Sequence, residues 1–482
     1  MKSFGIVGTG PKTQAKAARA SFHPQLFCNS EFEIITVNML TRRRFIRASL
    51  ATVAAPLCLR FPLFGQGAPN NLLNAALIGC GNEGVSADLR SFLVTGQNVI
   101  AVCDVDEQRA RAAVVGGGRL AGAKVYTDYR QLLDREKSLD AVIIATPDYW
   151  HAPLCRAFLK AGKHIYCEKP LTRTLGEAGQ LAALSRTSKS VTQMGNQGSS
   201  SATLRRSVEV IQAGVLGAIR DIYVVSPSEQ YPTGMDRPPG DDPVPAGLNW
   251  DFWVGPSPLR PYKKKIYHPY EWRGWYDFGT GQLGNWGCHI LNLPFRALSL
   301  GLPSRVEING TGLGHETYWT GGEITYHFDS SQGPVQIHWM ENRPRPAAFD
   351  DIAALHGERN LNGLVIVGTK GQIYTDSHNG GALLKLTEDK KFRDVLHHEA
   401  LKDIPQTLSR VHGHMQEWVD ACKGGPATFS GFEISSRLTQ ISLMGVLPLR
   451  LGRSVDYSPS GEIVNEPQAD VLIHNEDRKN WL

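Results

Sequence analysis

The stretch LNAALIGCGNEG at residues 73–84 predicts the fold of the first half of the chain. Its first six residues are a mainly apolar run with the length of a strand. Gly79, Gly81 and Gly84 follow at the spacing G-x-G-x-x-G, where a helix would begin. In such a turn, glycines let backbone N–H groups approach a pyrophosphate at the positive end of the helix. The pattern therefore predicts a dinucleotide site.

A second signal concerns which dinucleotide binds. Asp104 ends the next apolar run, twenty residues after Gly84. A carboxylate at this position accepts the two hydroxyls of a ribose and repels a 2′-phosphate. The spacing favours NAD over NADP. The alternative is a glycine turn followed by an acid that only caps a helix.

Short apolar runs alternate with helical patterns as far as residue 194, which is typical of a parallel sheet with crossover helices. We predict an α/β fold that begins with a doubly wound Rossmann domain over residues 70–200. The expected strands are Leu73–Ile78, Asn98–Cys103, Lys124–Tyr126, Ala141–Ala145, His164–Cys167 and Val191–Met194. The expected helices lie at about 83–95, 106–115, 128–136, 150–161 and 176–188.

Polar residues follow two of these strands, at the edge where a parallel sheet opens a ligand crevice. Asp148 comes after the fourth strand, and Glu168 and Lys169 come directly after the fifth. The Lys169 ammonium could donate a hydrogen bond to a substrate oxygen that gains negative charge, which would assist hydride transfer. The alternatives are a helix-capping Asp148 and a solvated Lys169.

The second half of the chain predicts a different kind of sheet. Its expected strands lack regular crossover helices, so we expect a C-terminal α+β domain, residues 201–482, built on an open, largely antiparallel sheet. These strands are Ile219–Val225, Ser304–Leu313, Gly322–Asp329, Val335–Glu341, Leu364–Val367 and Ile373–Asp376. Helical spacing appears over Val411–Cys422 and Glu433–Val446.

The connection at residues 226–280 is long and rich in proline, glycine and aromatic residues. Long ordered loops usually cover or line a site, and flat rings with polar neighbours suit a sugar. We therefore predict a substrate pocket here, with the alternative that the rings form only the core of the loop. The candidate substrate residues are Arg273, Trp275, Tyr276, Asp277 and Trp286.

Several of these motifs together resemble one known family. GCGNEG at 79–84, ATPDYWHA at 145–152 and above all CEKPL at 167–171 are similar to the Gfo/Idh/MocA oxidoreductases, and the resemblance runs to the end of the chain. NWDFWVGP at 249–256 and the segment Gly279–Leu298 resemble a secreted branch with twin-arginine signals. The resemblance implies an NAD-binding first domain. It also implies a second α/β domain whose open sheet faces the substrate on one side and a partner subunit on the other.

The resemblance also implies a partner and a cofactor. We expect the chain to form a homo-oligomer through its C-terminal sheet. The eight cysteines form no C-x-x-C pair, and no histidine lies at zinc-ligand spacing, so we predict no metal site. The expected cofactor site comprises Gly79, Gly81, Gly84, Asp104, Thr146, Pro147, His151, Glu168, Lys169 and Asn196.

Asn285 and His289 complete the expected catalytic group with Lys169. Many relatives in the family carry Asp and His at these two positions, and the spacing i, i+4 puts both on one helical face. His289 would take the proton of a substrate hydroxyl while hydride leaves the carbon. An amide stabilises an imidazolium less than a carboxylate does, so we expect His289 to be a weaker base here, with help from Lys169 or Asp277. The alternative is a histidine satisfied by backbone.

We therefore expect an NAD(P)-dependent oxidoreductase that acts on a sugar or polyol and holds its cofactor tightly. Two alternatives stay open. One is an NAD-dependent glycosidase or lyase that oxidises a sugar transiently. The other is a non-catalytic, cofactor-bearing sugar-binding subunit.

The basic charge is concentrated near the beginning of the chain. Residues 1–60 hold nine of the 51 Lys and Arg but only two of the 46 acids. The rest of the chain therefore carries 42 Lys and Arg against 44 acids and offers no basic face for nucleic acid.

TRRRFIR at 41–47 and the apolar run after it resemble a twin-arginine signal over 39–69. An amphipathic first helix is the alternative. We expect residues 1–38 to be unstructured or untranslated, with Met39 as the start. We also expect export to the periplasm or cell envelope by the twin-arginine machinery.

Overall fold

The computed structural model describes residues 71–115, 120, 122–228, 231–330, 333–357, 361–466, 469–473 and 478. These residues belong to one compact unit, Phe64–Leu482. The expected extension 1–38 and the expected signal 39–69 lie outside the described residues. Within the described part of the chain, every helix is too short or too polar to cross a membrane.

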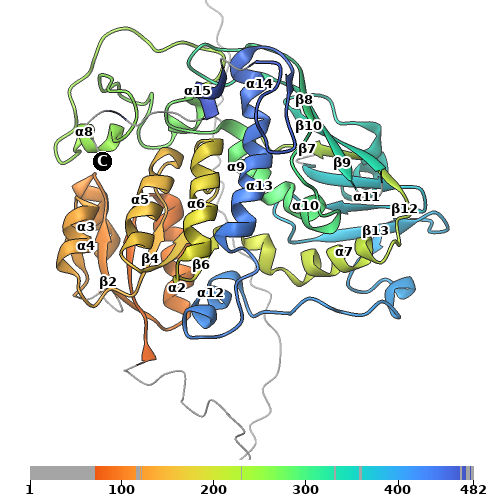
Figure 1. Ribbon diagram of the computed structural model, residues 1–482, viewed down its shortest axis with the longest axis horizontal. Helices are drawn as coiled ribbons and strands as arrows, with labels where there is room; N and C mark the ends of the chain where they lie inside the picture. The colour runs from red at the N-terminus through yellow and green to blue at the C-terminus, as the bar shows by residue number, and fades with distance from the viewer. Residues whose placement is uncertain are drawn as a thin grey trace, which may run out of the picture. The chain divides into compact units, whose positions relative to one another are not determined.

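The first domain is built on a six-stranded parallel sheet in the order β3-β2-β1-β4-β5-β6 (Figure 1). The strand order reverses between β1 and β4, where doubly wound sheets open a ligand crevice. The sequence predicts each strand to within one residue, because strands buried on both faces read as short continuous apolar runs. The strands are β1 (Asn74–Ile78), β2 (Asn98–Cys103), β3 (Lys124–Tyr126), β4 (Ala141–Ile144), β5 (His164–Cys167) and β6 (Thr192–Met194).

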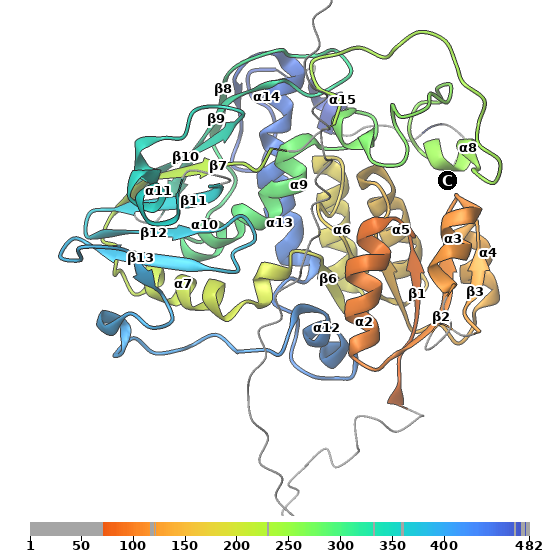
Figure 2. The same cartoon turned by 180° about the vertical axis from the view of Figure 1, so that it is seen from behind.

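Helices follow the first five strands and confirm the predicted Rossmann domain. α5 and α6 lie in front of the sheet in Figure 1, and α2 lies on the opposite side in Figure 2. The segment predicted as one helix over 83–95 begins instead with a π-helical stretch, η3, and continues as α2. The elements are η3 (Gly84–Leu89), α2 (Arg90–Val94), α3 (Glu107–Val114), α4 (Tyr129–Arg135), α5 (Asp148–Lys160) and α6 (Leu175–Thr187).

The second domain contains a nine-stranded sheet in the order β14-β13-β12-β11-β7-β10-β9-β8-β15. Its pairs are antiparallel except for β7 and β10, which run parallel. This confirms the predicted open, largely antiparallel sheet. Its strands are β7 (Ile219–Val225), β8 (Arg305–Thr311), β9 (Gly321–Ser330), β10 (Gly333–Glu341), β11 (Gly363–Gly368), β12 (Gly371–Thr375), β13 (Ala382–Leu386), β14 (Arg393–Asp394) and β15 (Val455–Asp456).

The second domain carries helices as well as its sheet, and two of them, α9 (Gly281–Ile290) and α13 (Phe432–Met444), lie between the two sheets in both views (Figures 1 and 2). Another of these helices completes the core of the first domain. The Trp418 ring packs against Phe92 and Tyr166, with centroids 6.0 and 5.8 Å away. The helices concerned are α7 (Ala202–Gln212), α9 (Gly281–Ile290), α10 (Asn292–Ala297), α12 (His414–Cys422), α13 (Phe432–Met444) and α14 (Val446–Leu451).

Candidate active site

The turn after β1 has the geometry that its glycines predict. Gly79 adopts φ +93°, and a Cβ there would lie 2.5 Å from the carbonyl oxygen of Ala145. A Cβ on Gly84 would lie 2.2 Å from the carbonyl oxygen of Gly79. Only glycine fits at either position, since real Cβ atoms do not approach backbone so closely. The glycines therefore let the turn pack closely against the end of β4 and the start of η3. The other side of the turn is open to a ligand.

Asp104 shapes this turn and also lines the cleft above it. One carboxylate oxygen accepts the backbone N–H of Cys80 at 2.7 Å, and the other accepts that of Asp106 at 2.9 Å. Burial raises the pKa of Asp104 to about 6, while these two N–H groups act in the opposite direction. The group is therefore an acceptor at neutral pH and keeps lone pairs for a ribose.

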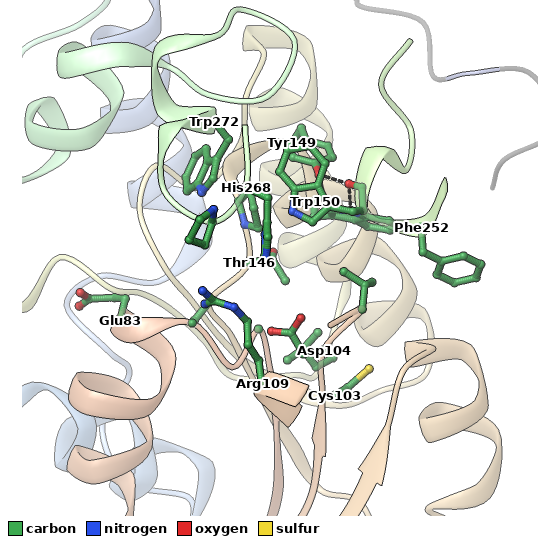
Figure 3. A pocket seen from close by; sticks show the side chains of 18 of the residues that line it. Glu83, Cys103, Asp104, Arg109, Thr146, Tyr149, Trp150, Phe252, His268 and Trp272 are labelled. Atoms are coloured by element: carbon green, nitrogen blue, oxygen red, sulfur yellow. Dashed lines mark hydrogen bonds between the residues drawn. The ribbon is translucent and has the colours of Figure 1, made fainter. Parts of the chain in front are cut away.

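Residues from both domains form the cleft (Figure 3). Asp104 and Arg109 lie on one wall, and His268, Trp150 and Trp272 lie across from them. The hydroxyl of Thr146 is buried and has no hydrogen-bond partner within the described residues. The residues that line the cleft include Gly79, Gly81, Glu83, Asp104, Arg109, Thr146, Pro147, Tyr149, Trp150, Phe252, Trp253, His268, Tyr270, Trp272 and Arg273.

The aromatic wall belongs to a segment of the long connection, residues 247–273, which we call the strap. Its backbone is hydrogen-bonded to the turn after β2: Glu107 N–H donates to the Gly247 carbonyl at 3.0 Å, and Asn249 N–H donates to the Val105 carbonyl at 2.9 Å. The carbonyl of Trp253, in the short helix α8 (Trp250–Val254), accepts the Tyr149 hydroxyl. The strap is therefore fixed to the first domain and covers the cleft.

Of the five expected substrate residues, three are held by contacts within the protein, and a fourth, Arg273, lies at the dinucleotide cleft. Trp275 is fully buried and its indole N–H donates to the Ile266 carbonyl at 2.7 Å. Tyr276 is buried beneath Arg450, and Asp277 is ion-paired with Arg260. Arg273 lines the same cleft as the glycine turn. The rings of Trp275 and Tyr276 thus lie in the core of the loop, the alternative that the sequence left open, and the carboxylate of Asp277 is held by Arg260.

A second group of residues lies around Lys169, at the end of β5. Its Nζ donates to Oδ1 of Asn285 at 3.0 Å. His289 lies one helical turn after Asn285 on α9 and is only 3% exposed. Burial, and then the charge of Lys169, hold the pKa of His289 well below its usual value. The imidazole is therefore neutral at pH 7 and a weaker base than usual, in the direction that Asn285 suggested.

The sequence did not single out His378, which the structure adds to this group. Its ring lies 5.0 Å from the ring of His289 and 5.0 Å from that of Trp286, between centroids. His378 belongs to the loop between β12 and β13, where DSHNGG at 376–381 reads only as a turn. Trp286, the fifth expected substrate residue, thus lies beside both histidines.

Glu168 is the centre of an acidic group, two of whose three members are buried, that the sequence did not predict. It accepts the side-chain amide of Gln197 at 3.3 Å, and burial raises its pKa to about 7. Asp88 of η3 is also buried, and burial raises its pKa well above its usual value. Oxygens of Glu83, Asp88 and Glu168 lie within 4.8 Å of one another. Burial therefore favours the protonated form of both buried carboxyl groups.

Two of the expected cofactor ligands, His151 and Asn196, are buried and hydrogen-bond to backbone groups of the crevice. The ring nitrogens of His151 face the carbonyl oxygens of Pro170 and Thr146 at 2.7 and 2.8 Å. The amide of Asn196 donates to the Cys288 carbonyl of α9 at 3.3 Å. His151 thus links the turns after β4 and β5, and Asn196 links β6 to α9.

Comparison with known proteins agrees with this geometry. Residues 73–196 match a family model described as "Oxidoreductase family, NAD-binding Rossmann fold", and residues 229–351 match "Oxidoreductase family, C-terminal alpha/beta domain". Glycosyl hydrolase family 109 protein 1 of Shewanella sp. (strain MR-4) is 33% identical over 171 residues, which are 34% of this chain and 37% of that protein. Inositol 2-dehydrogenase of Salmonella paratyphi B (strain ATCC BAA-1250 / SPB7) is 36% identical over 126 residues, 26% of this chain and 36% of that protein.

The chain thus aligns with little more than a third of the length of these curated relatives. Among solved structures, a levoglucosan dehydrogenase in complex with NADH aligns over 80% of this chain and 98% of its own, with a TM-score of 0.53 and 19% identity. This likeness shows that the two chains share the fold.

Proposed function

This chain belongs to the Gfo/Idh/MocA family of oxidoreductases, whose two domains it carries, and we propose that it transfers hydride between NAD and a CH–OH carbon of a sugar or polyol. The observation that carries the proposal is the convergence of Lys169, Asn285 and His289 where β5 meets α9. An ammonium next to a neutral imidazole suits the removal of a hydroxyl proton. The names of the dehydrogenase relatives support this substrate class.

The cleft fits the cofactor. The N–H groups of the turn at Gly79–Gly84 would hold the pyrophosphate, and Asp104 would hold a ribose. The buried, unpartnered hydroxyl of Thr146 offers a further hydrogen bond inside the cleft. NAD, when bound, supplies the acceptor for the hydride.

Lys169 and His289 would divide the work on the substrate oxygen. The Lys169 ammonium stabilises negative charge on that oxygen and so lowers the pKa of the hydroxyl. His289, neutral because of its low pKa, accepts the proton. Asn285 holds the Lys169 ammonium in place through its 3.0 Å hydrogen bond and brings no charge that would compete with the substrate for it.

We further propose that the cofactor stays bound between turnovers. The strap lies across the cleft and is hydrogen-bonded to the first domain at both sides of Leu248. A dinucleotide could leave only after these bonds open. A retained cofactor suits a cycle in which hydride returns to a sugar.

One relative favours a second candidate function. The protein that is 33% identical over its aligned part is named a glycosyl hydrolase of family 109. A retained NAD would also serve a reaction that oxidises a sugar carbon transiently and removes a proton from the acidified carbon next to it. A leaving group is then eliminated from the carbon beyond, water adds to the double bond, and the hydride returns. A non-catalytic sugar-binding subunit is the third candidate, although it would need neither Lys169 nor His289.

Export and assembly are also proposals. TRRRFIR at 41–47 supports export by the twin-arginine route, and replacement of Arg42 and Arg43 by Lys should leave the protein in the cytoplasm upon cell fractionation. The sheet side that bears the stacked pair Tyr223–His338, with centroids 5.0 Å apart, is the expected contact between copies. Light scattering should give a mass above that of one chain.

The test of the main proposal starts with the purified protein. Denaturation should release about one NAD per chain, measured by mass spectrometry. A panel of sugars and polyols is then added to the native protein, and absorbance near 340 nm reports reduction of bound cofactor. Lys169→Met should keep its NAD but reduce the cofactor at least roughly 100-fold more slowly, while Lys169→Arg should be less affected.

Product analysis separates the candidates. Oxidised sugar supports the dehydrogenase, and a released aglycone with no net redox change supports the glycosidase. A protein that neither holds nor binds NAD would contradict both. Spectral response to sugars without any product would leave the binding subunit.

A further inference from the structure

We propose that His378 is the outlet through which the proton taken by His289 reaches water, an inference that rests on the proposed function. His289 itself is 3% exposed, and its Nδ1 is buried with no hydrogen-bond partner among the described residues. A base in such a position must pass its proton to a neighbour before it can act again. The structure offers His378 for this step.

The rings around His289 differ in their ability to carry a proton. Trp286 and His378 contact His289, at centroid separations of 5.9 and 5.0 Å. An indole cannot accept a proton near neutral pH, whereas an imidazole accepts on one nitrogen and releases from the other. His378 is exposed and lines an open groove together with Glu83 and Gln197. A proton on His378 therefore has direct access to solvent.

Hydrogen bonds within the loop hold His378 beside His289. Oδ1 of Asp376 accepts the backbone N–H groups of His378 at 2.9 Å and of Gly380 at 3.0 Å. Asn379 adopts φ +58° and is only 1% exposed. Asparagine is one of the few residues other than glycine that adopt this left-handed conformation readily.

The partners of Asn379 show what fixes the loop. Its carbonyl oxygen accepts the Thr375 hydroxyl at 2.9 Å, and its amide donates to the backbone carbonyl of His289. This carbonyl lies in the last turn of α9, where carbonyls lack partners within the helix. The residue next to His378 is thus hydrogen-bonded to the residue that His378 would serve.

Burial, with help from the charge of Lys169, favours the neutral form of both rings. The His378 side chain is exposed but partly covered by its neighbours, and this partial burial lowers its pKa. Lys169 lowers the pKa further, and Asp376 and Glu83 act in the opposite direction. Burial and Lys169 also lower the pKa of His289. Two neutral imidazoles each have one free lone pair, which a relay requires.

The proton balance of the step is simple. The substrate O–H bond breaks and an N–H bond forms on His289, while the electron pair of the C–H bond leaves as hydride to the NAD of the proposed function. His289 then returns to its neutral form as His378 takes a proton and releases one to water. In a cycle that returns the hydride, the proton re-enters by the same route.

The experiment has one arm that needs no turnover. In the NAD-bound chain labelled with 15N-histidine, NMR measures the exchange of the His289 ring N–H with water. His378→Gln should slow this exchange at least 10-fold. His412→Gln, the same change at an exposed histidine of the same groove, should leave it unchanged. An equal exchange rate in His378→Gln and wild type overturns the relay.

The second arm measures chemistry. With a sugar that the wild type oxidises, His378→Ala should lower kcat at least 10-fold and change KM less than 3-fold, and added imidazole should restore part of the rate. A loss without rescue would mean that the loop has only a structural role, and it overturns the relay. If the wild type oxidises no sugar, the proposed function fails and the exchange rates alone decide the relay.

Discussion

Lys169 and Asn285 are 116 residues apart in the chain, yet Nζ of the lysine donates to Oδ1 of the asparagine at 3.0 Å. The hydrogen bond joins the end of β5 in the first domain to α9 of the second. It fixes the ammonium near His289, whose pKa the charge of Lys169 lowers. Because residue 285 is a neutral amide and not a carboxylate, it brings no negative charge to offset the effect of Lys169 on the pKa of His289.

Asn285→Asp should therefore raise the pKa of His289. The new carboxylate pairs with Lys169 and stabilises the imidazolium, so we expect a rise of about 1 unit or more, measured by histidine NMR. Because the proposed base works when deprotonated, the acid limb of kcat/KM should move to higher pH by a similar amount. Asn285→Leu has nearly the same size without the charge and should not raise the pKa. An equal response in both variants would contradict this account.

Asp104 should determine the choice between NAD and NADP. Asp104→Asn removes the charge that repels a 2′-phosphate, while Arg109 stays in the same cleft. The ratio of NADP to NAD affinity should rise roughly 10-fold or more, measured by calorimetry on protein stripped of its cofactor. Asp106→Asn is the matched control, since Asp106 caps α3 and asparagine is as good a cap. A similar shift in the control would remove Asp104 from this role.

The first domain could be predicted closely because its signals are local. Most of its strands are short, mainly buried apolar runs, and the glycine turn is recognised from the spacing of three glycines in one short segment. β13, β14 and β15 were missed. β14 is two exposed residues, Arg393 and Asp394, and only its pairing with β13 makes it a strand. Context of this kind is absent from a local pattern.

The candidate site, like the fold, could be predicted only where the signal is local in the sequence. The sequence identified Lys169 and His289 from motifs, and the structure brings them together. It also predicted that the loop at 226–280 covers a site, but the backbone bonds at Gly247 and Asn249 decide that the strap lies over the dinucleotide cleft. His378 has no periodic signal, since its position depends on the fold of a six-residue turn against α9.

The strap should control how fast NAD leaves. Gly255 adopts φ +56°, and a Cβ there would lie 2.5 Å from the Trp150 ring. Gly255→Ala should push the strap away from α5 and speed the release of NAD at least roughly 10-fold, because packed interiors cannot absorb such an overlap. The measurement is the NAD content of the protein after extended dialysis.

Gly240→Ala is the control for backbone strain. Gly240 adopts φ +77°, but the nearest atom to its Cβ would be Lys263 Nζ at 3.9 Å. Its NAD retention should match the wild type. Equal loss of NAD from both variants would mean that strain in the loop, and not contact with Trp150, governs release.

His414 should make the protein less stable in acid. It is buried at the start of α12, where its Nε2 faces the Met194 carbonyl and its Nδ1 faces the Ser200 hydroxyl, both at 2.8 Å. Burial lowers its pKa to about 4. Above pH 6.5 the ring is neutral in the folded and unfolded chains, so stability is complete. As the pH falls from about 6.5 to 4, only the unfolded chain gains a proton, which should remove roughly 3 kcal/mol.

Urea unfolding between pH 7 and pH 4.5 measures this slope. His414→Gln keeps a donor for the Met194 carbonyl and does not titrate, so it should be less stable at pH 7 but lose less stability on acidification. His412→Gln changes an exposed histidine two residues earlier and should keep the wild-type slope. If His414→Gln follows the wild-type slope, the acid sensitivity comes from other groups, and the buried hydrogen bonds of His414 do not keep its ring neutral.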